Sequence, residues 1–180
     1  MPEKPSILTR RTVARSRLFH VEEMELLFAN GARRCFERLV GSGHGAVLIV
    51  PMLDPDTVLM IREYAAGTQR YELALPKGLV EPGEDLLDAA NREIMEEVGH
   101  GAHQLTHLTS FSIAPGYLSH TTHIILAQDL YPERRPGDEP EDIEVVPWRL
   151  SDLDSLVGRE DCTEARSIAA LYLVRDRLKR

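Results

Sequence analysis

The clearest periodic pattern along the chain lies between Asp85 and Val98, where apolar side chains recur at the spacing of a helix. The apolar positions are Leu87, Ala90, Ile94 and Val98. Their intervals of three or four residues place them on one face at about 3.6 residues per turn. Gly99 follows directly, and glycine is common just past the end of a helix. This segment is therefore predicted to be an amphipathic helix that ends at Gly99.

Shorter patterned segments on both sides of this helix are predicted to be strands. Apolar runs bounded by Pro, Gly and Asp support them. The predicted strands are 46–51, 57–63, 105–113, 122–129 and 143–149. The segments 76–83 and 131–140 are rich in Pro, Gly or charge, and are predicted to be loops. A second helix is predicted over 161–179, from the apolar positions Ile168, Leu171, Leu173, Val174 and Leu178.

The N-terminal part of the chain carries a different pattern. Residues 1–11 contain Pro2 and Pro5 and show little periodicity, so they are predicted to be loose. Strands are predicted from Val13 to about Val40, with a hairpin at Asn30-Gly31, because this pair suits a type I′ turn with positive φ at both central residues. A flexible joint is predicted at Gly41-Ser42-Gly43.

The composition predicts one ordinary domain with a small appendage. The chain has 180 residues and a net charge of −8, so no general nucleic-acid-binding surface is expected. Its start is polar and basic, and no apolar run approaches the roughly 20 residues of a membrane helix, so we expect neither a signal peptide nor a membrane span. Two cysteines, Cys35 and Cys162, form no disulfide or zinc pattern, and reduced thiols in a cytoplasmic protein are expected.

The predicted helix carries a concentration of carboxylates away from its apolar face. Glu93 and Glu97 are one turn apart, and Glu96 lies beside them. Close carboxylates repel unless a cation lies between them, and hard divalent cations prefer oxygen ligands. The pattern therefore predicts a site for Mg²⁺, or alternatively Mn²⁺, facing a phosphate. The competing interpretation is a solvated acidic face with an ion pair between Arg92 and Glu96.

The whole constellation resembles the signature of a known family. It runs Gly78-x5-Glu84-x7-Arg92-Glu93-Ile94-x-Glu96-Glu97-x-Gly99, which is similar to the Nudix box of the Nudix hydrolases. The box usually ends in an apolar residue, whereas this chain has His100, which departs from the pattern just after the predicted helix. The resemblance implies an α/β/α sandwich around a mixed central sheet, formed by residues 45–180. Residues 1–44 would then be an antiparallel strand extension.

Residues outside the box resemble the ADP-ribose pyrophosphatase branch of the family. They are Arg62-Glu63-Tyr64, Tyr71-Glu72-Leu73 and Pro115, sixteen residues after Gly99. Residues 12–19, 89–93, 127–132 and 137–140 further resemble bacterial ADP compounds hydrolases. The implied reaction is Mg²⁺-dependent hydrolysis of the pyrophosphate in ADP-ribose, NADH or diadenosine polyphosphates, with release of AMP. Alternatives are a hydrolase specific for ADP-ribose, an enzyme that removes an RNA cap, and a non-catalytic nucleotide sensor. A sensor would be expected to have lost glutamates of the box, and none is missing here.

The resemblance also implies roles for particular residues. The implied metal ligands are Glu93, Glu96, Glu97 and the backbone carbonyl of Lys77. Arg92 would pair with one of these glutamates and hold it in place. Glu84 would support the metal ligands without binding the metal itself. The catalytic candidates are Glu93 and Glu97, together with Glu139 and Glu141 as candidate bases in the acidic stretch 138–144. A solvated loop is the competing interpretation of that stretch.

The substrate and the partner chain are expected to engage two further sets of residues. The candidate substrate contacts are Arg62, Glu63, Tyr64 and Glu72. A strand-end arginine is often an ordinary surface residue, so a contact between Arg62 and phosphate is one of two open interpretations. In the resembled branch the N-terminal extension builds a homodimer, and the apolar run 24–28 would suit that role or would cover its own domain.

Overall fold

The computed structural model describes residues 2–41 and 43–179, and the chain divides into two compact units. The first unit holds the chain up to Gly45 together with Ser112–Thr121, and the second unit holds the remainder. The sequence did not predict that Ser112–Thr121 belong with the N-terminal strands. Ser42 of the predicted joint, and the terminal residues 1 and 180 of the predicted domains, lie outside the described residues.

The first unit is a small sheet in the strand order β1-β2-β3-β9. Its strands are β1 (Ser6–Arg15), β2 (His20–Leu27), β3 (Arg33–Val40) and β9 (Leu118–Ser119). The first three strands pair antiparallel, and β9 runs parallel to β3. The prediction that residues 1–11 are loose was wrong, because Ser6 already starts a strand. Cross-strand ion pairs stabilise this polar sheet, such as Arg11 Nε to Glu23 Oε1 at 2.8 Å.

The hairpin between β2 and β3 is present, but its turn differs from the predicted type I′. Among the described residues, Gly31 has a positive φ of 81° and Asn30 does not. The Gly31 N–H donates to the Phe28 carbonyl at 2.9 Å, and the Phe28 N–H donates to the Ala32 carbonyl at 2.9 Å. These contacts describe a three-residue loop whose last residue is left-handed, which requires glycine at that one position.

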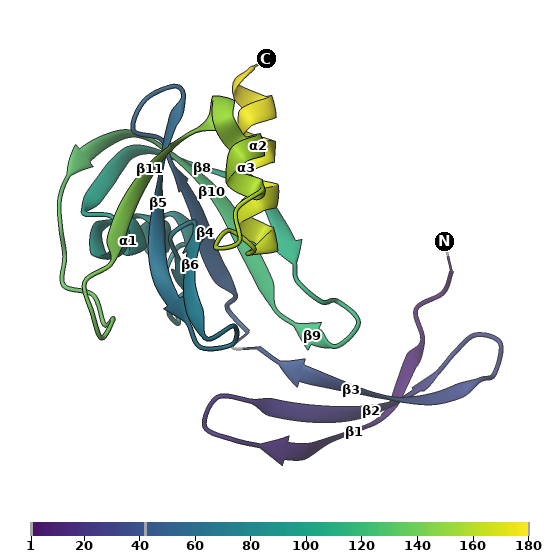
Figure 1. Cartoon of the computed structure of the whole chain (residues 1–180). Coiled ribbons are helices and arrows are strands. Elements are labelled where there is room, and N and C mark those ends of the chain that lie inside the picture. Colours follow the sequence, from purple (N-terminus) through teal and green to yellow (C-terminus); the bar gives the residue numbers. More distant parts are fainter. Residues whose placement is uncertain (1, 42, 180) are drawn as a thin grey trace. The chain divides into compact units, whose positions relative to one another are not determined.

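The second unit contains two strand groups, in the orders β7-β4-β10-β8 and β11-β5-β6 (Figure 1). β4 and β10 pair parallel, whereas β7 pairs antiparallel with β4, so the arrangement is mixed. The strands are β4 (Ala46–Pro51), β5 (Thr57–Ala65), β6 (Arg70–Ala74), β7 (Lys77–Leu79), β8 (His100–Ser112), β10 (Thr121–Pro132) and β11 (Glu144–Arg149). β7 lies inside the predicted loop 76–83, and β10 extends into the predicted loop 131–140. β6 was not predicted.

The helices of this unit are α1 (Leu86–Glu97), the 3₁₀ turn η1 (Leu150–Asp152), α2 (Leu153–Val157) and α3 (Ala165–Leu178). The Asp85 carboxylate accepts from the Leu87 N–H at 2.8 Å and thereby caps the start of α1. Gly99 has a φ of 73° directly after the helix, so the predicted stop is confirmed and His100 begins β8 instead.

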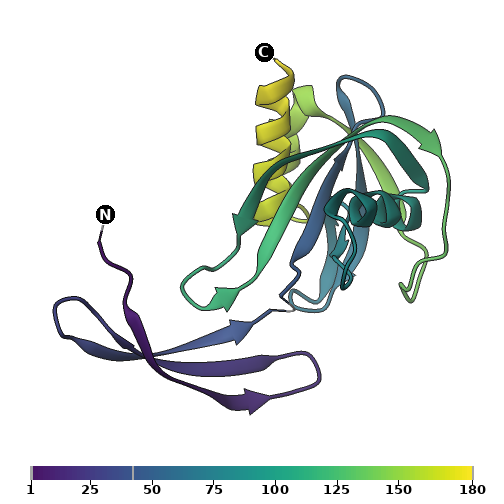
Figure 2. The same ribbon diagram turned by 180° about the vertical axis from the view of Figure 1, so that it is seen from behind.

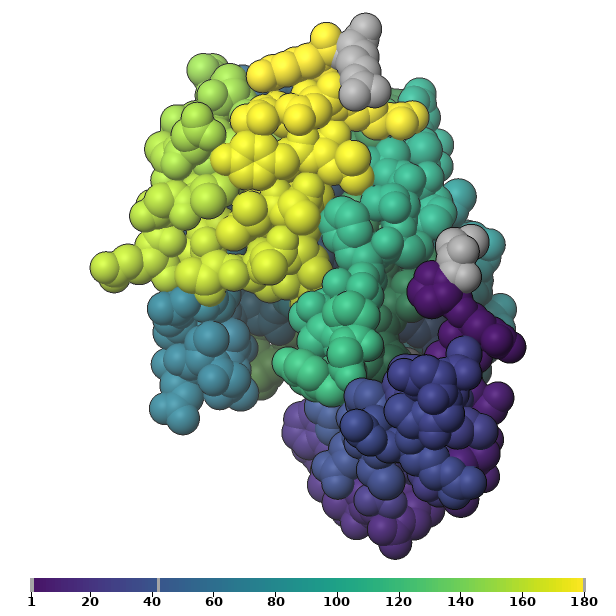
Figure 3. Space-filling model, turned by 90° about the vertical axis from the view of Figure 1, so that its right-hand side faces the viewer, coloured from purple at the N-terminus to yellow at the C-terminus, as the bar shows by residue number. Residues whose placement is uncertain are grey.

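The core lies on both faces of the strands and makes three layers. Alternate residues of β4 point to opposite sides, with Val47 and Ile49 packing with α1, and Leu48 and Val50 packing with α2 and α3. Figures 1 and 2 show α1 and α3 on opposite faces. In Figure 3, α3, in yellow, lies at the surface in the upper part of its unit, between yellow-green and teal segments. The predicted α/β/α sandwich with a mixed sheet is confirmed.

Two further observations concern the environment of the chain. In the described part of the chain, no helix combines the length and apolar character needed to cross a membrane. Cys35 is exposed, Cys162 is buried, and both thiols are free.

Candidate active site

Glu97, the last residue of α1, is the most deeply buried carboxylate of the predicted metal site. Its exposed fraction is 2%. The Lys77 N–H donates to its Oε2 at 3.0 Å. The Lys77 ammonium pairs instead with Glu63, 2.7 Å from its Oε2. Burial raises the pKa of Glu97 to about 8, although the nearby Lys77 charge opposes that rise. The charged form of Glu97 therefore lacks full compensation from the protein.

Glu93 lies one turn earlier on α1 and is 7% exposed. Burial raises its pKa, Arg92 opposes the rise, and the carboxylates of Glu96 and Glu139 add to it. The backbone of β7 passes so close that a Cβ on Gly78 would lie 2.0 Å from the Glu93 carboxyl group. Glycine at position 78 is what allows the strand and this carboxylate to approach each other.

Arg92 links the box residues to one another. Its Nε and Nη2 donate to the two carboxylate oxygens of Glu84 at 3.0 and 3.1 Å. Its Nη1 donates to Glu93 Oε1 at 2.7 Å and to Glu96 Oε2 at 3.3 Å. The hydrogen bonds from Arg92 lower the pKa of Glu84. A planar guanidinium with five donors suits this branched arrangement, so Arg92 holds Glu84, Glu93 and Glu96 as one network.

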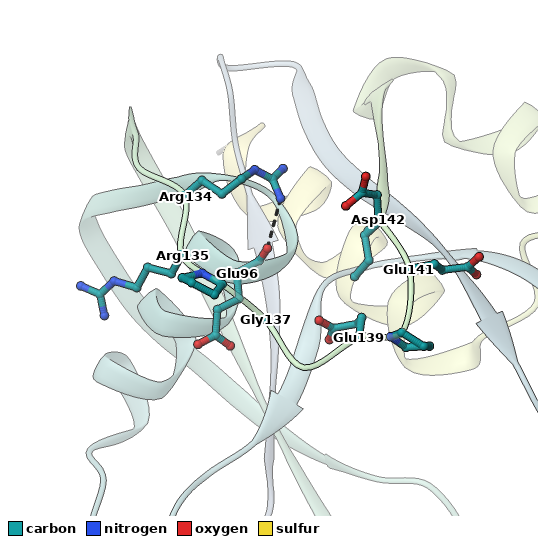
Figure 4. Close-up of a pocket in the computed structure, with 10 residues that line it drawn as sticks. Glu96, Arg134, Arg135, Gly137, Glu139, Glu141 and Asp142 are labelled. Carbon is teal, nitrogen blue, oxygen red and sulfur yellow. Dashed lines mark hydrogen bonds between the residues drawn. The ribbon is translucent and has the colours of Figure 1, made fainter.

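The loop between β10 and β11 brings further charged residues beside α1 (Figure 4). A pocket of about 320 Å³ is lined by Glu96, Arg134, Arg135, Pro136, Gly137, Glu139, Pro140, Glu141, Asp142 and Ile143. A Cβ on Gly137 would lie 2.4 Å from Glu139 Oε2 and 3.7 Å from the Glu96 Cβ, so the loop passes close to the box helix. Glu139 therefore lies near Glu93 and Glu96, whereas Glu141 accepts a hydrogen bond from the Tyr71 hydroxyl at 2.8 Å.

The four predicted substrate contacts fall into two groups. Tyr64, with Arg62 and Glu63, lines a pocket of about 100 Å³ whose other wall is 139–143. The charged group of Arg62 already donates to Glu144 and Asp161. Glu72 is 7% exposed, and its carboxylate accepts from Arg70 Nε at 2.7 Å and from the Thr163 hydroxyl at 3.0 Å. Glu72 therefore connects β6 to the segment before α3 rather than lining the pocket.

The donor set at the end of α1 fits a hard divalent cation. Glu93 and Glu97 offer carboxylate oxygens whose burial disfavours the ionised form, and a bound cation would supply the missing positive charge. Within the described residues, no three His, Cys, Asp or Glu side chains gather as a ready-made metal cluster. The Arg92 guanidinium contacts both Glu93 and Glu96 here, so joint binding of a cation by the predicted glutamates requires side chains to move.

Arg134, Arg135 and Tyr71 were given no site role from the sequence, although Tyr71 lies in one of the stretches that carry the resemblance. Arg134 Nη1 donates to the Glu96 carbonyl at 3.4 Å, and the Arg135 N–H donates to the Met95 carbonyl at 3.0 Å. The two arginines directly precede the acidic stretch of the same loop, which is a signal that the sequence offered. Tyr71 could not be found in this way, because its partner Glu141 is distant in the sequence.

Two family models match the chain and together span most of it. The model described as the NudE-type Nudix hydrolase N-terminal domain matches residues 5–38. The model of the NUDIX domain matches residues 43–171.

Individual proteins are also similar over nearly the whole length. ADP compounds hydrolase NudE of Escherichia coli is 52% identical, and the match covers 98% of this chain and 95% of that protein. ADP-ribose pyrophosphatase of Bacillus subtilis is 30% identical, with 91% of each chain covered. A solved structure titled "Crystal structure of ADP compounds hydrolase" superposes with a TM-score of 0.93 at 51% identity, covering 99% of this chain and 96% of that one.

Proposed function

The chain belongs to the Nudix hydrolase family, and we propose that it hydrolyses the pyrophosphate linkage of ADP-linked compounds with release of AMP. Candidate substrates are ADP-ribose, NADH and diadenosine polyphosphates. The observation that carries the proposal is the identity of 52% to an ADP compounds hydrolase over 98% of the chain. The similarity to an ADP-ribose pyrophosphatase supports a second candidate, an enzyme specific for ADP-ribose.

The proposed cofactor is Mg²⁺, with Mn²⁺ as the alternative. Its proposed ligands are Glu93, Glu96, Glu97 and the backbone carbonyl of Lys77. Support comes from the buried carboxylates of Glu93 and Glu97, whose raised pKa values indicate a shortage of positive charge. When bound, a divalent cation neutralises phosphate charge and polarises the phosphoryl oxygens.

The protein groups around this site have separate proposed tasks. Arg92 holds Glu93 and Glu96 in place and is itself fixed by Glu84. The Lys77 N–H orients the Glu97 carboxylate. Such fixed groups reduce the reorganisation that the reaction would otherwise require.

The proposed general base is Glu139, with Glu141 as the other candidate. Glu139 lies near Glu93 and Glu96, where the attacking water molecule must be deprotonated. Glu141 is engaged by the Tyr71 hydroxyl on the side of the β5–β6 hairpin. The placement therefore favours Glu139.

The adenosine or ribose part of the substrate is proposed to contact Tyr64 and Glu63, beside the pocket formed with 139–143. Arg62 lines the same pocket and is proposed to contact phosphate, which requires it to exchange a bond with Glu144 or Asp161. Glu72 has the least support among the four, because Arg70 and Thr163 already occupy its carboxylate.

The first unit is proposed to be the dimerisation element of a cytoplasmic homodimer. We retain residues 1–44 as the N-terminal extension and 45–180 as the Nudix hydrolase domain. Large apolar side chains are exposed on the extension, including Ile7, Leu18, Phe19 and Phe36. Exposed apolar surface of this kind is typical of an interaction surface. Sedimentation that shows a monomer at micromolar concentration would remove this part of the proposal.

The activity is tested with a panel of ADP-ribose, NADH, diadenosine triphosphate and sugar nucleotides. The purified protein is incubated with each compound in Mg²⁺ or in excess EDTA, and AMP is quantified by chromatography. We expect AMP from several ADP compounds in Mg²⁺ and none in EDTA. Turnover of ADP-ribose alone would favour the specific pyrophosphatase, and no turnover of any compound would contradict the proposal.

A further inference from the structure

The first half of the loop between β10 and β11 is attached to the end of α1 and to the residues just after it. The Glu133 N–H donates to the Gly99 carbonyl at 3.1 Å, and the Arg135 N–H donates to the Met95 carbonyl at 3.0 Å. Met95 is in the last turn of α1, where carbonyl groups have no partner within the helix, and Gly99 comes directly after the C-terminal cap residue, Val98. The beginning of the loop is therefore fixed to the same helix that carries Glu93 and Glu97.

The second half of the loop carries the two candidate bases, and they have different surroundings. Glu139 and Glu96 line the same pocket, and a Cβ on Gly137 would lie close to both the Glu139 carboxylate and the Glu96 Cβ, so Glu139 lies beside the box helix. Glu141 accepts a hydrogen bond of 2.8 Å from the Tyr71 hydroxyl, on β6. Figure 4 shows the side chains of Glu139 and Glu141 pointing in different directions from the loop.

Tyr71 is itself oriented by a neighbouring aromatic side chain. Tyr64 and Tyr71 are directly opposite each other in the antiparallel pair of β5 and β6. Their ring centroids are 5.5 Å apart and the rings meet edge to face at 70°. Aromatic pairs in this arrangement attract each other and restrict ring orientation. The Tyr71 hydroxyl is thus presented to the loop from a paired hairpin.

From this geometry we propose that Tyr71 is a positioning residue for hydrolysis. Its hydroxyl holds the Glu141 carboxylate, and this contact fixes the second half of the loop so that Glu139 faces the box glutamates. Glu141 is then the anchor of the loop and Glu139 is its base. The proposal rests on the proposed function, because it assigns the base of that reaction. A bond from a hydroxyl to a carboxylate is stronger than one between neutral groups, which suits this role.

The kinetic test uses Tyr71→Phe, Glu141→Gln and the double variant, with ADP-ribose and Mg²⁺. Tyr71→Phe removes one oxygen and keeps the ring contact with Tyr64. We expect kcat to fall roughly tenfold in Tyr71→Phe, with less change in KM, because the hydrogen bond to a charged group is lost. Glu141→Gln keeps an acceptor oxygen but removes its charge, so its kcat should fall by no more than that. The double variant should be no slower than Tyr71→Phe alone, because both substitutions act on the same contact.

Tyr172→Phe is the matched control. The Tyr172 hydroxyl donates to Asp154 Oδ1 at 3.0 Å, so the same type of bond is lost away from the loop. Its kcat should equal that of the unchanged chain. An unchanged kcat in Tyr71→Phe, or a double variant slowed by the product of the two single effects, would overturn the proposal. So would abolished turnover in Glu141→Gln combined with near-normal turnover in Glu139→Gln.

A second measurement does not depend on turnover. Backbone ¹⁵N relaxation of the amides of Gly137, Asp138, Glu139, Glu141 and Asp142 reports the order of the loop. We expect their order parameters to fall in Tyr71→Phe and to stay unchanged in Tyr172→Phe. Unchanged values in both variants would overturn the anchoring contact even if the chain hydrolyses ADP-ribose. If the unchanged chain turns over no ADP compound, the proposed function fails, and the assignment of Glu139 as its base fails with it.

Discussion

Glu97 and Glu164 are two glutamates at helix ends whose pKa values shift in opposite directions. Glu97 ends α1, and burial raises its pKa to about 8. Glu164 precedes α3, and burial acts on it in the same direction, but hydrogen bonds from Arg166 and Ser167 outweigh that effect and lower its pKa. The difference lies in the groups that surround each charge and not in burial alone.

Their hydrogen bonds account for this contrast. The Glu164 carboxylate accepts from Arg166 Nε at 2.7 Å, and from the N–H and hydroxyl of Ser167, both at 2.8 Å. Glu97 accepts from the Lys77 N–H. The start of a helix favours a negative charge and its end disfavours one. Glu164 is therefore arranged for stability, whereas Glu97 retains a need for positive charge that a divalent cation can meet.

The largest expected difference between the two glutamates is in catalysis. Glu97→Gln should lower kcat for ADP-ribose by roughly 10³-fold, because the substitution removes a charge from the proposed metal site. Glu164→Gln should stay within about threefold of the unchanged chain below its unfolding temperature, since losses of stability alone leave the folded fraction near one. Steady-state assays of AMP release in Mg²⁺ measure both. A comparable loss of kcat in the two variants would show that Glu97 has no catalytic role that Glu164 lacks.

The next difference concerns stability without metal. A folded-state pKa of about 8, against an ordinary value of 4.5, means that folded Glu97 binds its proton more tightly. The tighter proton binding by folded Glu97 contributes stability that is fully present below pH 4.5 and is lost as the pH rises through about 8. In EDTA at pH 9, Glu97→Gln should therefore be more stable than the unchanged chain, by on the order of 3–5 kcal/mol. Urea denaturation at pH 4.5 and pH 9 measures this difference, which should nearly vanish at the lower pH.

The smallest predicted effect has the opposite sign. The lowered pKa of Glu164 contributes stability that is present above pH 4.5 and is lost as the pH falls through the folded-state value. Glu164→Gln should therefore reduce the free energy of unfolding at pH 7 by about 1–2 kcal/mol, as for other helix caps. The same urea series tests this, and the difference should shrink below pH 4.5. A Glu164→Gln chain that is more stable than the unchanged one at pH 7 would show that the Glu164 carboxylate does not stabilise the start of α3.

Local patterns in the sequence predicted the box helix and most strands of the second unit. The α1 helix follows from apolar periodicity and from Gly99, which are signals within one segment. The first part of β1 was missed because the strand has no buried face, and its ion pairs with β2 join residues separated in sequence. The turn at Gly31 was assigned to the wrong type because the pair Asn30-Gly31 also suits a three-residue loop.

The candidate site also combines local signals with contacts between distant segments. Glu93, Glu96 and Glu97 could be named as candidate ligands from the sequence because one helix sets their spacing. Their unequal burial was not predictable, because it depends on β7 and on the β10–β11 loop. The contact between Tyr71 and Glu141 and the engagement of Glu72 by Thr163 depend on tertiary packing between segments that are remote in the sequence. Side-chain partners of that kind leave no periodic signal.

Mn²⁺ binding reports whether Glu97 and its neighbours bind a divalent cation. Electron paramagnetic resonance of free Mn²⁺ gives the dissociation constant for the unchanged chain, Glu97→Gln and Glu164→Gln at pH 8. We expect equal Mn²⁺ affinity for the unchanged chain and Glu164→Gln, and at least about tenfold weaker binding for Glu97→Gln. Equal affinity in all three chains would contradict the binding of the cation by Glu97.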